Sequence, residues 1–279
     1  MEKYENIYKK PKHFSFGQNW QNFLKNLNSN HIKQAKLSLA DFLKPYQIKN
    51  KTFIDIGCGS GLSSLAAFLL NAKKVISLDI DIASINCTKQ IKTKQGNPKN
   101  WAIKQGSILN RKFLKTLPKF GIVYSWGVLH HTGDMYTAID NATSLVEPNG
   151  LLFIAIYNDF QTRFHGGTSK FWLKVKKKYN QSSPLVKKIF FLFFAAYNIL
   201  GITFISSQNP IFYIKNYHHK RGMSWHHDII DWLGGYPYEF ATPDKIINHL
   251  GSKNFLCQKM KFNNGIGCNQ FLFKNLNKK

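Results

Sequence analysis

Between residues 52 and 157, short apolar runs alternate with segments of helical periodicity. Continuous apolar strands separated by helices are typical of a parallel sheet that helices cover on both faces. The sequence therefore predicts an α/β fold. The predicted strands are 52–56, 75–78, 101–104, 120–126 and 150–157, and the helices between them are 62–70, 83–91 and 135–146.

The alternation stops after Tyr157, and this break divides the chain. Residues 158–240 carry about three helical segments instead of one crossover, and the alternation returns with a helix at 243–250. Two more strands, 255–262 and 268–274, complete seven. We expect a helical N-terminal extension over 1–50, a domain made of 51–157 and 241–279, and a helical insert over 158–240 that covers the substrate site.

The first strand leads into a glycine-rich loop, Asp55-Ile56-Gly57-Cys58-Gly59-Ser60-Gly61. Glycines allow a tight turn and a close approach of the backbone to a ligand. The loop opens a helix, whose first N–H groups can bind a carboxylate. The dinucleotide-binding fingerprint needs its third glycine where Leu62 stands, so the loop does not match an NAD site.

A second acid, Asp79, ends the second strand, 22 residues after Gly57. A carboxylate at this point can accept hydrogen bonds from both hydroxyls of a ribose. Asp81 is expected to cap the helix that begins near Ala83.

These residues resemble the S-adenosylmethionine (SAM) loop of class I methyltransferases. The segment Val123-Tyr124-Ser125-Trp126-Gly127-Val128-Leu129-His130-His131 is similar to the fourth-strand motif of small-molecule methylases related to the quinone-biosynthesis group. The resemblance covers residues 50–157, and 243–274 by pattern. It implies a Rossmann-like, mostly parallel seven-stranded sheet and SAM as the cofactor, with S-adenosylhomocysteine as its product. The cofactor-binding residues that it implies are Asp55, Gly57, Gly59, Gly61, Asp79, Ile80, Ser107, Ile108, Ser125 and Trp126, with Ser107 standing where many relatives have Asp.

Methyl transfer requires alignment of the acceptor and, for an oxygen acceptor, removal of a proton. His131 follows the fourth strand at the carboxyl edge of the sheet, where ligands bind in open α/β folds, and is the first candidate base. His130 is a catalytic candidate that could instead contact the cofactor, and either histidine could simply cap or pack. Tyr157, at the root of the insert, is the third catalytic candidate.

The insert supplies the candidate substrate residues Arg221, Asn158, Trp225 and Tyr236. Arginine binds carboxylates and phosphates bidentately, although Arg221 could equally pair with Asp228, Asp231 or Glu239. Its aromatic residues could line a pocket or form the core of a lid. The histidine pairs show no spacing that links three metal ligands, so no metal is expected.

Lys and Arg number 39 against 14 Asp and Glu, which gives a formal net charge of +25. Such a charge attracts polyanions or anionic membrane surfaces. The apolar segment 189–205 follows Lys187 and Lys188 and is just short of the roughly 20 residues that cross a bilayer. Three interpretations are open: a buried lid helix, a helix on a membrane surface that makes 187–205 a peripheral contact, or a span.

The predicted function is O- or N-methylation of a small-molecule, lipid-like or anionic substrate. The alternatives are an RNA methyltransferase, which the charge favours, and a SAM-fold protein that binds a membrane or partner without turnover. No Asn- or Asp-Pro-Pro motif and no Pro-Cys pair occurs, so nucleic acid is the weaker acceptor. Four dispersed cysteines and the absence of an apolar leader predict a cytoplasmic protein, with membrane association open. The oligomeric state is not determined.

Overall fold

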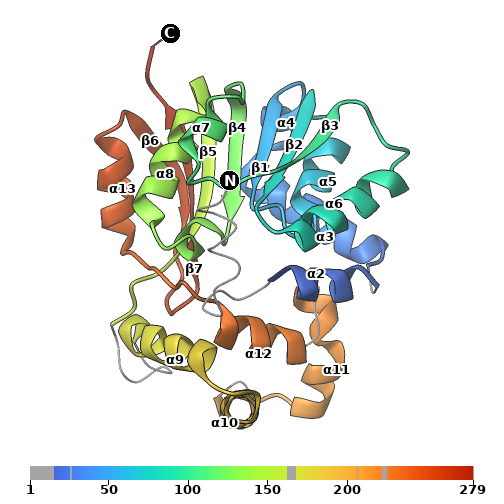
Figure 1. Cartoon of the computed structure of the whole chain (residues 1–279), viewed down its shortest axis with the longest axis vertical. Helices are drawn as coiled ribbons and strands as arrows, with labels where there is room; N and C mark the ends of the chain where they lie inside the picture. Colours follow the sequence, from blue (N-terminus) through green and yellow to red (C-terminus); the bar gives the residue numbers. More distant parts are fainter. Residues whose placement is uncertain (1–15, 26, 162–167, 206, 222–224, 279) are drawn as a thin grey trace.

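A computed structural model describes residues 16–25, 27–161, 168–205, 207–221 and 225–278. Its centre is one seven-stranded sheet in the order β3-β2-β1-β4-β5-β7-β6, in which β7 alone runs in the opposite direction to the other strands (Figure 1). The predicted Rossmann-like, mostly parallel fold is confirmed. The strands are β1 Thr52–Ile56, β2 Lys74–Asp79, β3 Trp101–Gln105, β4 Phe120–Trp126, β5 Val146–Tyr157, β6 Phe255–Lys261 and β7 Cys268–Asn275.

Helices cover both faces of the sheet (Figure 1). Side chains of a strand alternate between faces, so Phe53 joins one core cluster while Ile54 and Ile56 join the other. The first cluster packs under α3 Ser29–Phe42, α5 Leu62–Leu69 and α6 Ile82–Lys94, next to the short α4 Pro45–Ile48. The second packs under α7 Arg111–Leu114, α8 Met135–Ser144 and α13 Pro243–Gly251.

A chain of buried hydrogen bonds crosses the first face of the sheet. The Trp101 indole donates to Ser77 (2.8 Å), Ser77 to Ser64 (2.6 Å), and Ser64 to the Asp55 carboxylate (2.7 Å). Buried polar groups are costly unless they are paired, and here each one has its partner. The chain fixes the Asp55 side chain at the end of β1.

The N-terminal residues pack against this domain. Phe42 of α3 contacts Phe153 of β5, with ring centroids 4.8 Å apart. Helix α2, Phe16–Lys25, lies on the start of α6. A Cβ added at Gly17 would come within 1.8 Å of an Asp81 carboxylate oxygen, so only glycine permits this approach. Asp81 caps α6 as expected, because it accepts the backbone N–H of Ala83.

The insert contains four α-helices in its described residues, one more than expected. They are α9 Ser169–Gln181, α10 Pro184–Leu200, α11 Pro210–Arg221 and α12 Trp225–Gly234, and a π-helical turn, Gly201–Ile205, extends α10. These helices have a core of their own, built on Trp172, Tyr179, Ile229, Leu233 and Tyr238. They lie together at one end of the sheet (Figure 1).

The segment Pro184–Phe204 is long and apolar enough to cross a membrane, by length and composition, and only 11% of its most apolar window is buried. Of the α10 side chains, Ala195 alone is classed as buried. The interpretation of this segment as a buried lid helix is therefore wrong for most of its length.

The contact between α3 and the sheet predicts a clear stability effect. Phe153 is 3% exposed and stacks on Tyr124 at 4.9 Å as well as meeting Phe42. Phe153→Ala should lower the free energy of unfolding by about 3–5 kcal/mol, because the cavity cannot close fully. Urea denaturation measures this loss. Tyr46→Ala, at a residue that is 77% exposed, should change it by no more than about 0.5 kcal/mol, and equal losses for both variants would contradict the packing.

Candidate active site

The glycine-rich loop adopts a backbone that other residues rarely accept. Gly57, Gly59 and Gly61 have φ angles of +73°, +52° and +86°. A Cβ at Gly57 would lie 2.3 Å from a Val128 methyl group, so the loop also needs the missing side chain. Gly57 and Gly59 border a large cavity, while Gly61 is the N-cap of α5.

Two carboxyl groups flank this loop at the ends of neighbouring strands. Asp79 accepts the N–H of Gly59 and the N–H of Asp81, both at 2.9 Å, so it ties β2 to the loop after β1. Burial raises the pKa of Asp79 to about 6. Burial likewise raises the pKa of Asp55 to about 7, although the Ser64 hydrogen bond opposes this shift. Without a ligand, Asp79 therefore takes up a proton below about pH 6 and Asp55 below about pH 7.

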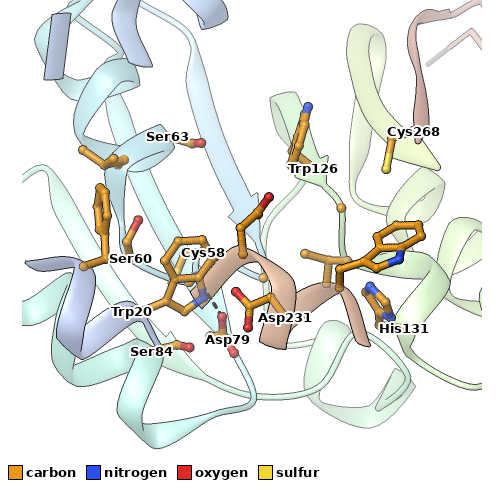
Figure 2. A pocket seen from close by; sticks show the side chains of 18 of the residues that line it. Trp20, Cys58, Ser60, Ser63, Asp79, Ser84, Trp126, His131, Asp231 and Cys268 are labelled. Carbon is orange, nitrogen blue, oxygen red and sulfur yellow. Dashed lines mark hydrogen bonds between the residues drawn. The ribbon is translucent and has the colours of Figure 1, made fainter. Parts of the chain in front are cut away.

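The cavity that these acids border has a volume of about 1280 Å³ and reaches into the insert. Figure 2 shows Trp20, Ser60 and Asp79 toward one side, His131, Trp126 and Cys268 toward the other, and Asp231 between them. Ligand pockets commonly measure about 300–1,000 Å³, so this cavity has room for two molecules. Its far wall is aromatic and includes Trp172, Trp225 and Trp232.

The cavity lining is acidic, although the whole chain is strongly basic. Five aspartates border the cavity, and Lys261 is the one Lys or Arg among the described residues that do so. A carboxylate-lined cavity favours a cationic ligand. The aspartates are Asp55, Asp79, Asp81, Asp228 and Asp231.

Trp20 is a cavity residue to which the sequence gave no role. A Cβ at Gly59 would lie 2.9 Å from the Trp20 indole nitrogen, so helix α2 brings this ring directly over the glycine loop. Phe23 and His31 extend the same wall. No periodicity shows where such a helix docks, so only the fold reveals its place.

Most of the predicted cofactor residues come together here. Ile80, Ser107, Ile108 and Trp126 border the cavity beside the loop, and the Ser107 hydroxyl accepts the N–H of Leu109 at 3.1 Å. Ser125 was expected to bind the cofactor, but its side chain lies elsewhere. Its side chain is fully buried and donates to the carbonyl of Ile56 at 3.0 Å, so it joins β4 to β1 and does not reach the cavity.

The two histidines lie in different environments. His131 borders the cavity, and its Nδ1 lies 2.5 Å from the carbonyl oxygen of Pro237. Because a carbonyl only accepts, the proton resides on Nδ1 and the lone pair on Nε2. Burial lowers the pKa of His131 to about 4. His131 therefore presents a neutral imidazole at pH 7.

His130 is fully buried and does not border the cavity, which argues against the contact with the cofactor that the sequence allowed. Its Nδ1 accepts the backbone N–H of Tyr157 at 3.4 Å. Burial holds its pKa well below the usual range. Its ring packs against the Tyr157 ring at 4.1 Å, and Tyr157 itself reaches the cavity.

Two of the four predicted substrate residues reach the cavity, Trp225 and Tyr236. Asn158 does not: it is buried and its amide donates to the carbonyls of Asn263 and Gly265, both at 3.0 Å, which pins the connection between β6 and β7. The Arg221 side chain lies outside the described part of the chain. Among the described residues, no group of three His, Cys, Asp or Glu is arranged to hold a metal ion.

The sheet order, the loop and its two carboxyl groups define the class I, Rossmann-like methyltransferase fold. Residues 28–226 match the methyltransferase domain family, and the chain belongs to that family.

The similar proteins agree with this assignment. A ubiquinone biosynthesis O-methyltransferase of Pelagibacter ubique is 29% identical over 132 residues, which cover 47% of this chain and 51% of that protein. A ribosomal protein methyltransferase of Psychrobacter is 48% identical over 50 residues, which cover 18% of this chain and 16% of that protein. The chain thus spans about half, or less, of these curated relatives.

A solved structure extends the likeness over nearly the whole chain. The magnesium protoporphyrin IX methyltransferase of Synechocystis with bound S-adenosylhomocysteine superimposes with a TM-score of 0.56 at 13% identity, covering 97% of this chain and 99% of that one. At this identity the likeness concerns the fold.

The residues present fit SAM, the cofactor of this class. Gly57 and Gly59 border the cavity, and the aspartates beside them suit ribose hydroxyls and a cation. Asp79 would hold the ribose, Asp55 the amino end, and Ile80, Ser107 and Ile108 would border the adenine.

Asp79→Asn should weaken the binding of S-adenosylhomocysteine by about 10- to 100-fold. The amide has one acceptor oxygen and cannot serve both Gly59 and a ribose, and hydrogen bonds to charged groups contribute about 1.5–3 kcal/mol. Titration calorimetry measures the affinity. Asp41→Asn, at an exposed carboxylate that faces Lys259, is the control and should leave it unchanged. An unaltered affinity in Asp79→Asn would remove Asp79 from the site.

Proposed function

We propose that the protein transfers the methyl group of SAM to a small, largely apolar acceptor held between the glycine loop and the insert helices. One observation carries the proposal: a single cavity joins the Asp55–Asp79 end to the aromatic wall of the insert. Proximity and alignment of two bound molecules supply most of what methyl transfer needs from a protein. The similarity to a ubiquinone biosynthesis O-methyltransferase supports an oxygen acceptor of this kind.

The acceptor side of the cavity is built from aromatic rings. Tyr157 contacts Trp232, with centroids 5.8 Å apart, and Trp172 contacts Trp232 at 5.6 Å. Trp225 is oriented by the hydrogen bond from its indole nitrogen to Asn198, at 2.8 Å. Such walls favour a flat, apolar molecule and contribute through burial of its surface.

When bound, SAM supplies a methyl group on a positively charged sulfur. We propose that His131 Nε2 accepts the proton of the acceptor hydroxyl. Its pKa of about 4 keeps the imidazole neutral at physiological pH. A base this weak is sufficient, because an oxygen that gains a methyl group becomes positively charged and therefore strongly acidic. The Pro237 carbonyl holds the ring in the tautomer that this role needs.

The reaction can be tested with alkyl-substituted phenols and the matching anilines as acceptors and with SAM labelled on its methyl group. We expect label to pass to the phenols, and His131→Gln to lower kcat by about 10²–10⁴ while the affinity for S-adenosylhomocysteine is kept. The loss with anilines should be smaller, because a neutral aniline nitrogen attacks through its lone pair without first losing a proton, whereas a phenol oxygen becomes a good nucleophile only as its proton leaves. Full activity of His131→Gln on phenols would exclude His131 as the base, and transfer to no acceptor would count against the proposed activity.

The raised pKa values of the two aspartates predict a pH-dependent affinity for S-adenosylhomocysteine. Without ligand, Asp79 and Asp55 are protonated below about pH 6 and 7. Donors of the ligand favour the ionised carboxylates, so binding must release protons at low pH. The affinity should rise between pH 5 and 7 and level off near pH 8.

The matched variant for this test is Ser64→Ala. It removes the hydrogen bond that lowers the pKa of Asp55, so it should move the upper part of the transition to higher pH. Calorimetry in two buffers of different ionisation enthalpy should detect proton release at pH 6 and none at pH 8. An affinity that is constant from pH 5 to 8 would show that these carboxyl groups do not contact the ligand.

A further inference from the structure

One side of the insert exposes an unusual amount of apolar surface. Seven large aliphatic or Phe side chains on α10, on the turn that follows it and on α11 are each more than half exposed, and we call them the apolar ridge. Monomeric soluble proteins rarely expose large apolar patches unless they bind something. The ridge consists of Leu185, Leu192, Phe193, Leu200, Phe204, Ile211 and Phe212.

The opposite side of α10 belongs to the protein interior. Phe190 and Phe194 pack on the insert core, and Phe194, Tyr197 and Asn198 border the cavity. Asn198 accepts the hydrogen bond from Trp225. A helix that packs along one side and holds a polar contact there cannot be surrounded by lipid, so α10 fits a surface helix and not a span.

The charge beside the ridge has one sign. No Asp or Glu occurs between Asp159 and Asp228, whereas α9 carries exposed Lys170, Lys174, Lys177 and Lys178, and α10 carries Lys188. Each lysine near an anionic membrane surface contributes about 1 kcal/mol to binding. Apolar side chains with flanking lysines are typical of helices that lie in the headgroup region.

We infer that the apolar ridge and the lysines of α9 and α10 form a docking surface for an anionic lipid bilayer. The helices that carry it lie at the end of the molecule farthest from the sheet, where a flat surface can reach them (Figure 1). Pairing of two copies through this face is the competing arrangement. It would bring the same lysines against one another, so charge complementarity favours the membrane.

This surface also bears on the substrate class, a step that rests on the proposed function. Helix α10 presents the ridge on one side and cavity residues on the other. Docking would hold the acceptor end of the cavity one helix away from the bilayer. The acceptor class is then an apolar phenol-like molecule dissolved in the membrane.

Vesicle flotation tests the docking without any need for catalysis. The full chain should float with phosphatidylcholine vesicles that contain 30% phosphatidylglycerol, and much less with phosphatidylcholine alone. Leu192→Ser/Phe193→Ser should weaken the partition by at least about tenfold. Lys174→Gln/Lys178→Gln should weaken it on the anionic vesicles only, by about tenfold or more.

The matched control is Leu37→Ser/Tyr46→Ser, which removes two exposed apolar side chains from α3 and α4 and should float like the unaltered protein. Unchanged circular dichroism and affinity for S-adenosylhomocysteine would show that each variant folds. Equal flotation of the ridge variant and the unaltered protein would overturn the inference. So would light scattering that shows a dimer dissociated by the ridge substitutions, with vesicle binding unaltered.

A second measurement separates docking from catalysis. With a long-chain alkylphenol in anionic vesicles, the ridge variant should lose methyl transfer, but with water-soluble 4-methylphenol it should keep it. If the ridge variant and the unaltered protein methylate both phenols at equal rates, the inference that the acceptor comes from the membrane would be overturned. Flotation that depends on the ridge, with no transfer to either phenol, would support the docking surface and count against the proposed function.

Discussion

The site depends on the hydrogen bond that the Asp79 carboxylate accepts from the Gly59 N–H. It joins the carboxyl ends of β2 and β1, which parallel pairing already brings to the same edge of the sheet. The positive φ angle of Gly59 lets the loop meet this carboxylate, and Gly59 also borders the cavity. Burial raises the pKa of Asp79 and the Gly59 N–H opposes this shift, so the carboxylate favours a ligand that donates further hydrogen bonds to it.

The insert extends this cofactor edge into one large cavity. The loops that follow the parallel strands lie at the carboxyl end of the sheet. The four helices of the insert cover that end and have a core of their own. The Trp20 ring closes the opposite side, since helix α2 brings it over Gly59. The aspartates of the sheet and of α12 then gather around one space in a chain that carries a net charge of +25. Five aspartates thus border the cavity, where a cationic ligand needs them, whereas Lys261 is the one Lys or Arg among the described residues that does so.

The exposed charge and the apolar ridge belong to the same helices, so they are best understood together. A basic surface by itself fits nucleic acid as well as a membrane. Seven exposed apolar side chains beside it favour lipid, because polyanion binding gains nothing from them. Helix α10 connects this surface to the cavity through Phe194, Tyr197 and Asn198. We therefore propose that membrane docking and methyl transfer take place on opposite sides of α10.

The sequence by itself determined the fold class, the glycine loop, Asp79 as the acid at the end of β2 and Asp81 as the cap of α6, because these depend on local periodicity and on chain direction in a parallel sheet. The sequence did not predict the positions of side chains whose partners come from distant segments. Ser125 turns to Ile56, Asn158 turns to the β6–β7 connection, and His130 is enclosed while its neighbour His131 reaches the cavity. Sequence spacing cannot show which of these side chains reach the cavity, because adjacent residues differ only in the direction that their side chains take. Only the tertiary structure decided that Trp20 covers the loop and that α10 is exposed, because both depend on which surfaces the rest of the chain leaves uncovered.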